Sequence, residues 1–143
     1  MYTDKRLPIH KLVYCEMIGA GNAASDFQND HREILIGQAL LPMENEVQIL
    51  EAVSGCDGAI IFSLNGLDPL SARVNNKFLS CNKTVLLVDL DTFTSTRAVD
   101  RMVDWIRRNG VLTLLVFGSS VPGAYGSVKL ILEMWAQRYL GKP

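Results

Sequence analysis

The stretch that decides the fold is residues 58–64, GAIIFSL, a continuous apolar run of strand length. Two later runs are of the same kind, residues 84–90, TVLLVDL, and residues 111–117, VLTLLVF. Strands that are apolar on both faces are covered on both faces, as in parallel sheets. The three runs therefore predict an α/β fold around a mainly parallel sheet.

Helical patterns alternate with these predicted strands. Asp68 before Pro69 is typical of an N-cap and a first helical residue, Ser95 or Thr96 is expected to cap the next helix, and Gly110 is expected to end it. The last helix is expected to begin near residues 122–123. Right-handed βαβ crossovers follow from this order. The apolar faces are Leu70, Val74, Phe78 and Leu79; Val99, Met102, Val103 and Ile106; and Val128, Ile131, Leu132, Trp135 and Tyr139. Trp135 and Tyr139 of the last face could join an interface, but core packing is favoured.

The first 57 residues carry a weaker pattern. Residues 11–17, KLVYCEM, predict a strand, and residues 19–22, GAGN, predict a tight turn. Residues 33–41 fit either a strand or part of a helix. Residues 44–53 have helical spacing, and Gly55 is expected to end that helix.

Composition limits the possible classes of function. The 143 residues suit one domain, residues 1–143, and the net charge of −1 gives no reason to expect a nucleic acid or an acidic membrane surface as partner. The N-terminus lacks the apolar segment of a secretory signal, and the apolar runs of about 8 residues are far shorter than a bilayer span. A cytoplasmic location is therefore expected.

The three cysteines, Cys15, Cys56 and Cys81, are widely spaced and include no CxxC pair. They predict neither a disulfide framework nor a zinc site. Cys15 and Cys56 lie beside apolar runs, so both are expected to be buried thiols.

Ligands of open parallel sheets bind beyond the carboxyl ends of the strands, which directs attention to three loops. Residues 118–123, GSSVPG, combine glycines, hydroxyls and a following helix start, a combination that suits an anion such as phosphate or molybdate. A plain strand-to-helix turn is an equally good interpretation. The other two loops are residues 65–68 and residues 89–94.

Other candidate groups have simpler interpretations. Asp89 and Asp91 could hold Mg²⁺ or act as acid and base, but satisfying backbone N–H groups in the turn is favoured. The GAGN segment could be a phosphate loop, but a plain turn is favoured because the third glycine is absent. His10 and His31 are expected at the surface. No catalytic residue and no metal ligand is assigned.

Four segments in order resemble the family of putative molybdenum carrier proteins, from about residue 46 to the C-terminus. Residues 57–63, DGAIIFS, are similar to the family's D-G-T-L-I-x-S strand, and residues 83–91, KTVLLVDLD, to its K-P-x-L-x-x-D-L-D strand. Residues 102–110, MVDWIRRNG, resemble its W-[IL] helix. Gly118 with residues 122–125, PGAY, resembles its A-G-P-R…P-G-I-Y segment.

The resemblance implies a Rossmann-like three-layer α/β/α fold, related to the lysine-decarboxylase-like nucleotide-binding proteins. It also implies a homo-oligomer and a small phosphate-bearing ligand, either molybdenum cofactor or a nucleotide. The ligand is then expected above the carboxyl ends of the strands. The residues expected to contact it are Gly66, Asp68, Ser71, Gly118, Ser119, Ser120, Gly123 and Tyr125.

The chain departs from the family pattern at three places. The family's opening G-G-Q-T-G-x-D loop is absent, so either residues 18–22 are a degenerate substitute or the first βα unit is missing; residues 7–10, LPIH, resemble a later family segment and favour loss. The glycines of the G-G-[ST]-A-L-T turn are replaced by residues 67–72, LDPLSA, where Asp68 would repel a phosphate. The cation of Gly-Pro-Arg is lost at residues 118–120.

Three hypotheses follow, in order of preference. The first is a carrier-like protein that binds a nucleotide-like or phosphate-bearing ligand. The second is a non-catalytic homo-oligomeric subunit with a degenerate site. The third is a nucleotide N-glycosidase or phosphoribohydrolase, which needs a carboxylate such as Asp68, Asp89 or Asp91 in the pocket. Whether the protein is an enzyme is left open, with a non-enzymatic role favoured.

Overall fold

The computed structural model describes residues 6–140, and within them five strands form one sheet. Every neighbouring pair of strands is parallel, and the order is β2-β1-β5-β3-β4. The predicted parallel α/β architecture is confirmed. The strands are β1 (Lys11–Cys15), β2 (Ile36–Leu40), β3 (Gly58–Ser63), β4 (Thr84–Asp89) and β5 (Thr113–Gly118).

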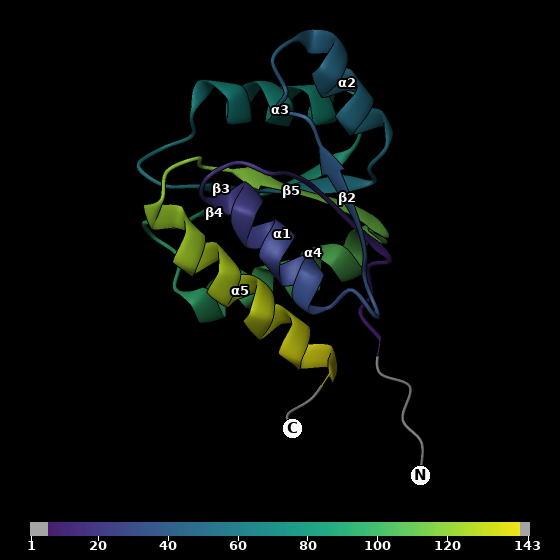
Figure 1. Cartoon of the computed structure of the whole chain (residues 1–143), viewed down its shortest axis with the longest axis vertical. Helices are drawn as coiled ribbons and strands as arrows, with labels where there is room; N and C mark the ends of the chain where they lie inside the picture. The colour runs from purple at the N-terminus through teal and green to yellow at the C-terminus, as the bar shows by residue number, and fades with distance from the viewer. Residues whose placement is uncertain (1–5, 141–143) are drawn as a thin grey trace.

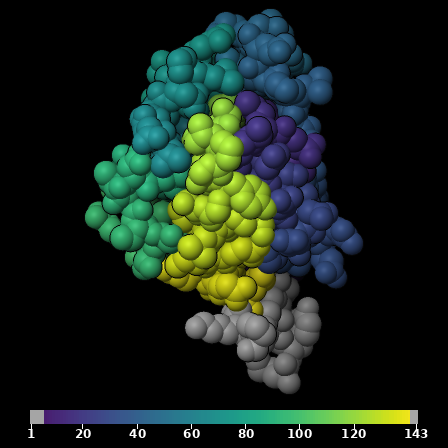
Figure 2. Space-filling model, turned by 60° about the vertical axis from the view of Figure 1, so that its left-hand side comes forward, coloured from purple at the N-terminus to yellow at the C-terminus, as the bar shows by residue number. Residues whose placement is uncertain are grey.

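Helices cover both faces of the sheet and complete a three-layer α/β/α structure (Figure 1). On one face, α5 lies between α1 and α4 (Figure 2). On the other face lie α2 and α3. The helices are α1 (Ala20–Asp30), α2 (Glu46–Ser54), α3 (Pro69–Ser80), α4 (Ser95–Asn109) and α5 (Gly123–Leu140).

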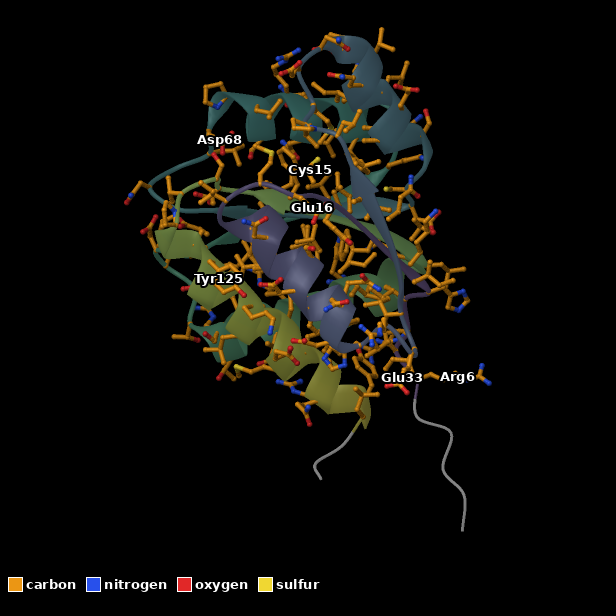
Figure 3. All side chains as sticks on the ribbon, viewed as in Figure 1. Arg6, Cys15, Glu16, Glu33, Asp68 and Tyr125 are labelled. Atoms are coloured by element: carbon orange, nitrogen blue, oxygen red, sulfur yellow. The ribbon has the colours of Figure 1, made fainter. Side chains whose placement is uncertain are left out.

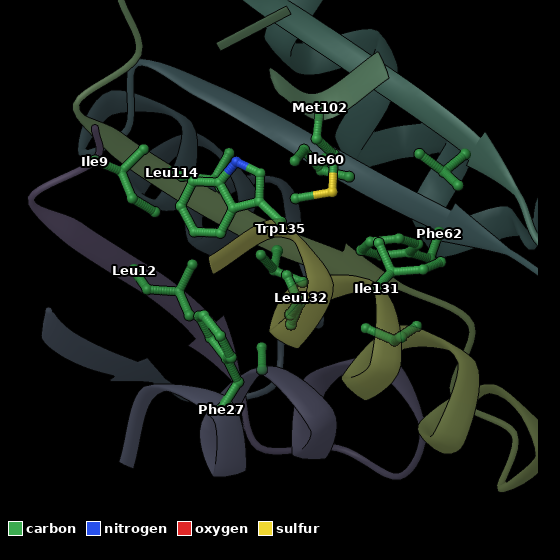
Figure 4. Close-up of a cluster of buried hydrophobic side chains, with 14 of the residues drawn as sticks. Ile9, Leu12, Phe27, Ile60, Phe62, Met102, Leu114, Ile131, Leu132 and Trp135 are labelled. Carbon is green, nitrogen blue, oxygen red and sulfur yellow. The ribbon is translucent and has the colours of Figure 1, made fainter. Parts of the chain in front are cut away.

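Each central strand contributes side chains to two separate cores, because successive side chains point to opposite faces of the sheet. Ile60 and Phe62 of β3 point into the core beneath α1, α4 and α5 (Figure 4), whereas Ile61 points into the core beneath α2 and α3. Trp135 of α5 is 1% exposed and packs in the first core, and Tyr139 packs partly against it. The core interpretation of the α5 stripe is therefore confirmed.

The N-terminal segment forms a βα unit of the same sheet. The expected tight turn over residues 19–22 is largely wrong, because α1 begins at Ala20 and only Gly19 lies in the turn. This helix gave little apolar signal since small residues, including Ala20, Ala23 and Ala24, make its buried face. Residues 33–41 contain the strand β2, one of the two alternatives.

The structure confirms some expected helix ends and corrects others. Asp68 caps α3, and Gly110 ends α4 in the left-handed region with φ of 59°. The cap of α4 is Thr94, one residue before the expected Ser95, because the Thr94 side chain accepts a hydrogen bond from the Arg97 backbone N–H. Leu79 was expected on the buried face of α3 but is exposed.

None of the helices within residues 6–140 combines the length and the apolarity that crossing a membrane requires.

Candidate functional site

The loops after β3, β4 and β5 meet at one edge of the sheet. In the parallel register Ser63 lies opposite Asp89, and Phe62 lies opposite Gly118. The Ser119 backbone N–H donates to the Phe62 carbonyl at 2.8 Å, which fixes the start of the β5 loop. We call this edge, formed by residues 64–68, 90–94 and 118–123, the carboxyl rim. It gathers the three loops that the sequence singled out.

Gly118 is required by close backbone packing at the rim. Its φ is 143°, and a Cβ atom built on it would lie 2.0 Å from the Phe62 carbonyl oxygen. A residue with a side chain would therefore push the β5 loop away from β3. This glycine lets the two loops approach each other.

The turn before α1 also belongs to the rim. Gly19 has φ of 90°, and a Cβ atom there would lie 2.4 Å from the Ser119 carbonyl oxygen and 2.7 Å from that of Val121. The Ala20 backbone N–H donates to the same Ser119 carbonyl at 3.0 Å. The sequence interpretation left this turn out of the site, although a GxG pair followed by small residues was a signal for it.

The helices that leave the rim after β5 and β3 diverge to opposite faces of the sheet. Helix α5 follows β5 on one face of the sheet, and α3 follows β3 on the other face (Figure 1). Neighbouring strands with this arrangement form a topological switch point, where open α/β sheets bind ligands. Of the described carbonyls, none accepts a backbone hydrogen bond from the N–H groups of Ser120, Val121 or Gly123.

Two of the predicted ligand residues are paired with each other. The Asp68 carboxylate accepts hydrogen bonds from the Ser71 backbone N–H at 2.8 Å and from the Ser71 hydroxyl at 3.0 Å. Ser71 is fully buried. Both residues thus hold the first turn of α3.

Tyr125 connects two helices. Figure 3 shows Tyr125 at the start of α5. Its hydroxyl donates to the Asp26 carboxylate of α1, which raises the pKa of Tyr125 because the hydrogen bond favours the neutral phenol. The contact joins residues 99 positions apart in the sequence. It secures the start of α5 against α1, next to the Gly19 turn.

The remaining predicted residues line the loops themselves. Ser119 is 5% exposed, whereas Ser120 and Gly123 are exposed. Gly66 has φ of 94°, and no atom lies within 4 Å of a Cβ built on it. Gly66, Ser120 and Gly123 therefore leave backbone groups exposed at the rim, whereas Ser119 is buried beneath it.

Asp89 at the end of β4 and Asp91 after it stabilise the rim loops. The Asp89 carboxylate accepts from the Asp91 N–H at 2.9 Å, and the Asp91 carboxylate accepts from the Asn65 N–H at 2.6 Å. The favoured turn interpretation is confirmed by these contacts. Within residues 6–140, no three His, Cys, Asp or Glu side chains gather as a metal site would require.

One histidine has a partner that the sequence did not predict. His31 is 15% exposed, and its Nε2 lies 2.9 Å from Oε1 of Glu133 in α5. The partner is 102 positions away in the sequence, so no local pattern could reveal it. His10 is exposed, as expected.

The buried cysteines offer no nucleophile. Burial raises the pKa of Cys15 to about 11 and that of Cys56 to about 12. The thiolate is the reactive form, so both remain unreactive at neutral pH. The expectation that they are buried thiols is confirmed.

The hollows of the surface lie apart from the carboxyl rim. One of about 390 Å³ lies between β2 and α2, and an apolar one of about 370 Å³ lies beside α4, near Val111 and Tyr139. Neither is lined by a predicted ligand residue. The rim therefore offers exposed backbone groups at a switch point and is not lined by either of these hollows.

Comparison with known proteins gives one informative likeness. No protein-family model and no curated protein matches the chain. The crystal structure of a putative molybdenum carrier protein from Syntrophus aciditrophicus SB superimposes with a TM-score of 0.80 at 21% sequence identity. The match covers 92% of this chain and 97% of that chain.

The chain has the fold of that protein. At this identity the likeness concerns the fold, so it confirms the Rossmann-like three-layer architecture and the structural resemblance predicted from the sequence. The ligand of the chain is a separate question.

Proposed function

We propose that the chain binds a small phosphate-bearing ligand, such as a nucleotide or a molybdenum-cofactor-like molecule, above the carboxyl rim. The observation that carries the proposal is the contact between the Gly19 turn and the β5 loop. It brings the starts of α1 and α5 to one place, where two helix dipoles and unpaired N–H groups favour an anion. The molybdenum carrier name of the structural neighbour agrees with such a ligand.

The proposed contacts come mainly from the backbone. Ser120 and Gly123 would supply N–H groups and the Ser120 hydroxyl on one side, and Gly66 would supply open backbone on the other. Gly118 and Ser119 would support them, because the Ser119 N–H already holds the β5 loop against β3. Asp68, Ser71 and Tyr125 then have a supporting role, because their polar atoms already hold α3 and α5 in place.

We infer that the Gly19 turn replaces the family's glycine-rich opening loop. The segment β1–Gly19–α1 has the strand–turn–helix order that such a loop needs, and its glycine packs against the β5 loop. Under this proposal residues 1–143 are a single domain with a degenerate first βα unit. The cytoplasmic location and the homo-oligomeric state stay predictions.

The N-glycosidase hypothesis has less support. It needs a carboxylate free to act on the ligand, but Asp68, Asp89 and Asp91 all accept backbone hydrogen bonds. Incubation with nucleoside monophosphates, followed by chromatography for released base, tests it. We expect no release, and steady release would reverse the order of the two hypotheses.

Isothermal titration with AMP and with molybdate tests the binding proposal. We expect Ser120→Asp to weaken binding at least about tenfold, because a carboxylate would stand beside the anion. Ser80→Asp is the matched control, since Ser80 is exposed at the far end of α3 and should leave binding unchanged. Absence of heat with both ligands, or equal affinity in both variants, would contradict the site.

A further inference from the structure

Strand β2 is an open edge of the sheet. Among the described strands it pairs only with β1, and it lies at the margin of the molecule (Figure 1). Residues 34–43, ILIGQALLPM, contain no charged side chain. Ile36 is 65% exposed and Leu41 is 81% exposed. Charged side chains, which usually protect an edge strand from pairing with another chain, are therefore lacking on β2.

The direction of the backbone groups on β2 follows from one hydrogen bond. The Ile36 N–H donates to the His10 carbonyl at 3.2 Å, toward β1. Backbone groups alternate along a strand, so those of Gln38 and Leu40 also face β1. Those of Gly37 and Ala39 face outward, and the described residues provide no backbone partner beyond β1 for them.

This edge is complementary to itself. When two copies of β2 pair in antiparallel fashion around Gln38, Gly37 of each copy lies opposite Ala39 of the other. Both residues point their N–H and C=O groups outward, so each such pair exchanges both hydrogen bonds. Ile36 comes opposite Leu40 on the face toward α2, where the two apolar side chains form a cross-strand pair.

We propose that β2 is the surface through which a second copy of this chain binds, joining the two sheets into one continuous sheet. An identical strand suits this edge because a two-fold axis through Gln38 pairs the outward groups of both Gly37 and Ala39, and residues 34–43 bring no charged side chain to the contact. The hollow between β2 and α2, lined by Leu40, Leu41 and Met43, leaves room for the side chains of the second copy.

The other edge strand, β4, is a poorer candidate. Leu86 and Val88 are buried there, and α3 and α4 pack against the strand. Only Leu87 among residues 84–89 is exposed. The two edges thus provide a test and its control within one molecule.

Light scattering across a range of concentrations measures the association. We expect a dimer for the unaltered chain and at least a tenfold weaker dimer for Ala39→Pro, because proline removes an outward N–H and leaves the β1 ladder intact. Leu87→Pro is the matched control, since the Leu90 N–H donates to Ser63 on β3 and the Leu87 N–H therefore faces outward on β4. It should dimerise like the unaltered chain.

A second variant keeps the proposal testable if a proline disturbs folding. Gln38→Cys in a Cys81→Ser background places two thiols across the two-fold axis, with Cα atoms about 4.5 Å apart, within the range of a disulfide. We expect a covalent dimer under mild oxidation. A monomer at all concentrations, a dimer that Ala39→Pro leaves unchanged, or a dimer that Gln38→Cys fails to link would each overturn the proposal.

Discussion

At the scale of the residue, burial divides the cysteines into two classes. Cys15 and Cys56 are 1% and 2% exposed, whereas Cys81 follows α3 at the surface. Burial raises the pKa of the first two to about 11 and 12, since a thiolate would be poorly solvated in the core. Both therefore remain protonated thiols across the neutral range.

A thiol titration at pH 8 checks this difference. The native protein should react rapidly at Cys81 alone, and the slow thiols should react at the rate of unfolding. The denatured chain should show all three thiols. Cys81→Ser supplies the control, because it should remove the fast phase and leave the slow phase. A fast phase that survives in Cys81→Ser would mean that a buried thiol is accessible.

At the scale of the element, the cap of α3 shows how a predicted ligand residue acquires a structural role. Asp68 accepts hydrogen bonds from the Ser71 N–H and hydroxyl. We expect Asp68→Ala to lower the free energy of unfolding by about 1 kcal/mol, since it leaves a helix N–H and a buried hydroxyl without their acceptor. Asp68→Asn should recover most of the loss, because an amide oxygen also caps.

Urea unfolding of the two variants measures these free energies, and titration of AMP separates the two roles of Asp68. Unchanged ligand affinity in folded Asp68→Ala agrees with a capping role alone. Tighter binding would instead mean that the carboxylate repels the anion, as the sequence comparison suggested.

The elements differ in how much of them the sequence could predict. Strands β3, β4 and β5 were predictable because sheets covered on both faces leave long apolar runs. Helix α1 was not, since close packing against β1 selects small residues there: a Cβ on Gly21 would lie 1.9 Å from the Cys15 carbonyl oxygen. The rim loops were predictable from strand ends, but the Tyr125–Asp26 and His31–Glu133 contacts depend on the packing of α1 against α5.

At the scale of the whole molecule, α5 connects the helices that cover one face of the sheet. It packs between α1 and α4, and its Trp135 lies in the core with Phe27 at a ring-centroid distance of 6.4 Å. Because the side chains of β3 contribute to the cores on both faces of the sheet, loss of one core weakens support for the other. The described chain should therefore unfold as one cooperative unit.

Trp135→Ala tests this cooperativity. We expect it to lower the free energy of unfolding by about 3–5 kcal/mol, as large-to-small changes in a packed core do, while circular dichroism and tryptophan fluorescence still report a single transition. Fluorescence then comes from Trp105, which lies on the buried face of α4 and donates to the Thr84 hydroxyl at 2.8 Å. Leu130→Ala on the exposed face of the same helix should cost less than about 0.5 kcal/mol. Two separate transitions in Trp135→Ala would show that the two faces of the sheet unfold independently, which contradicts a single domain.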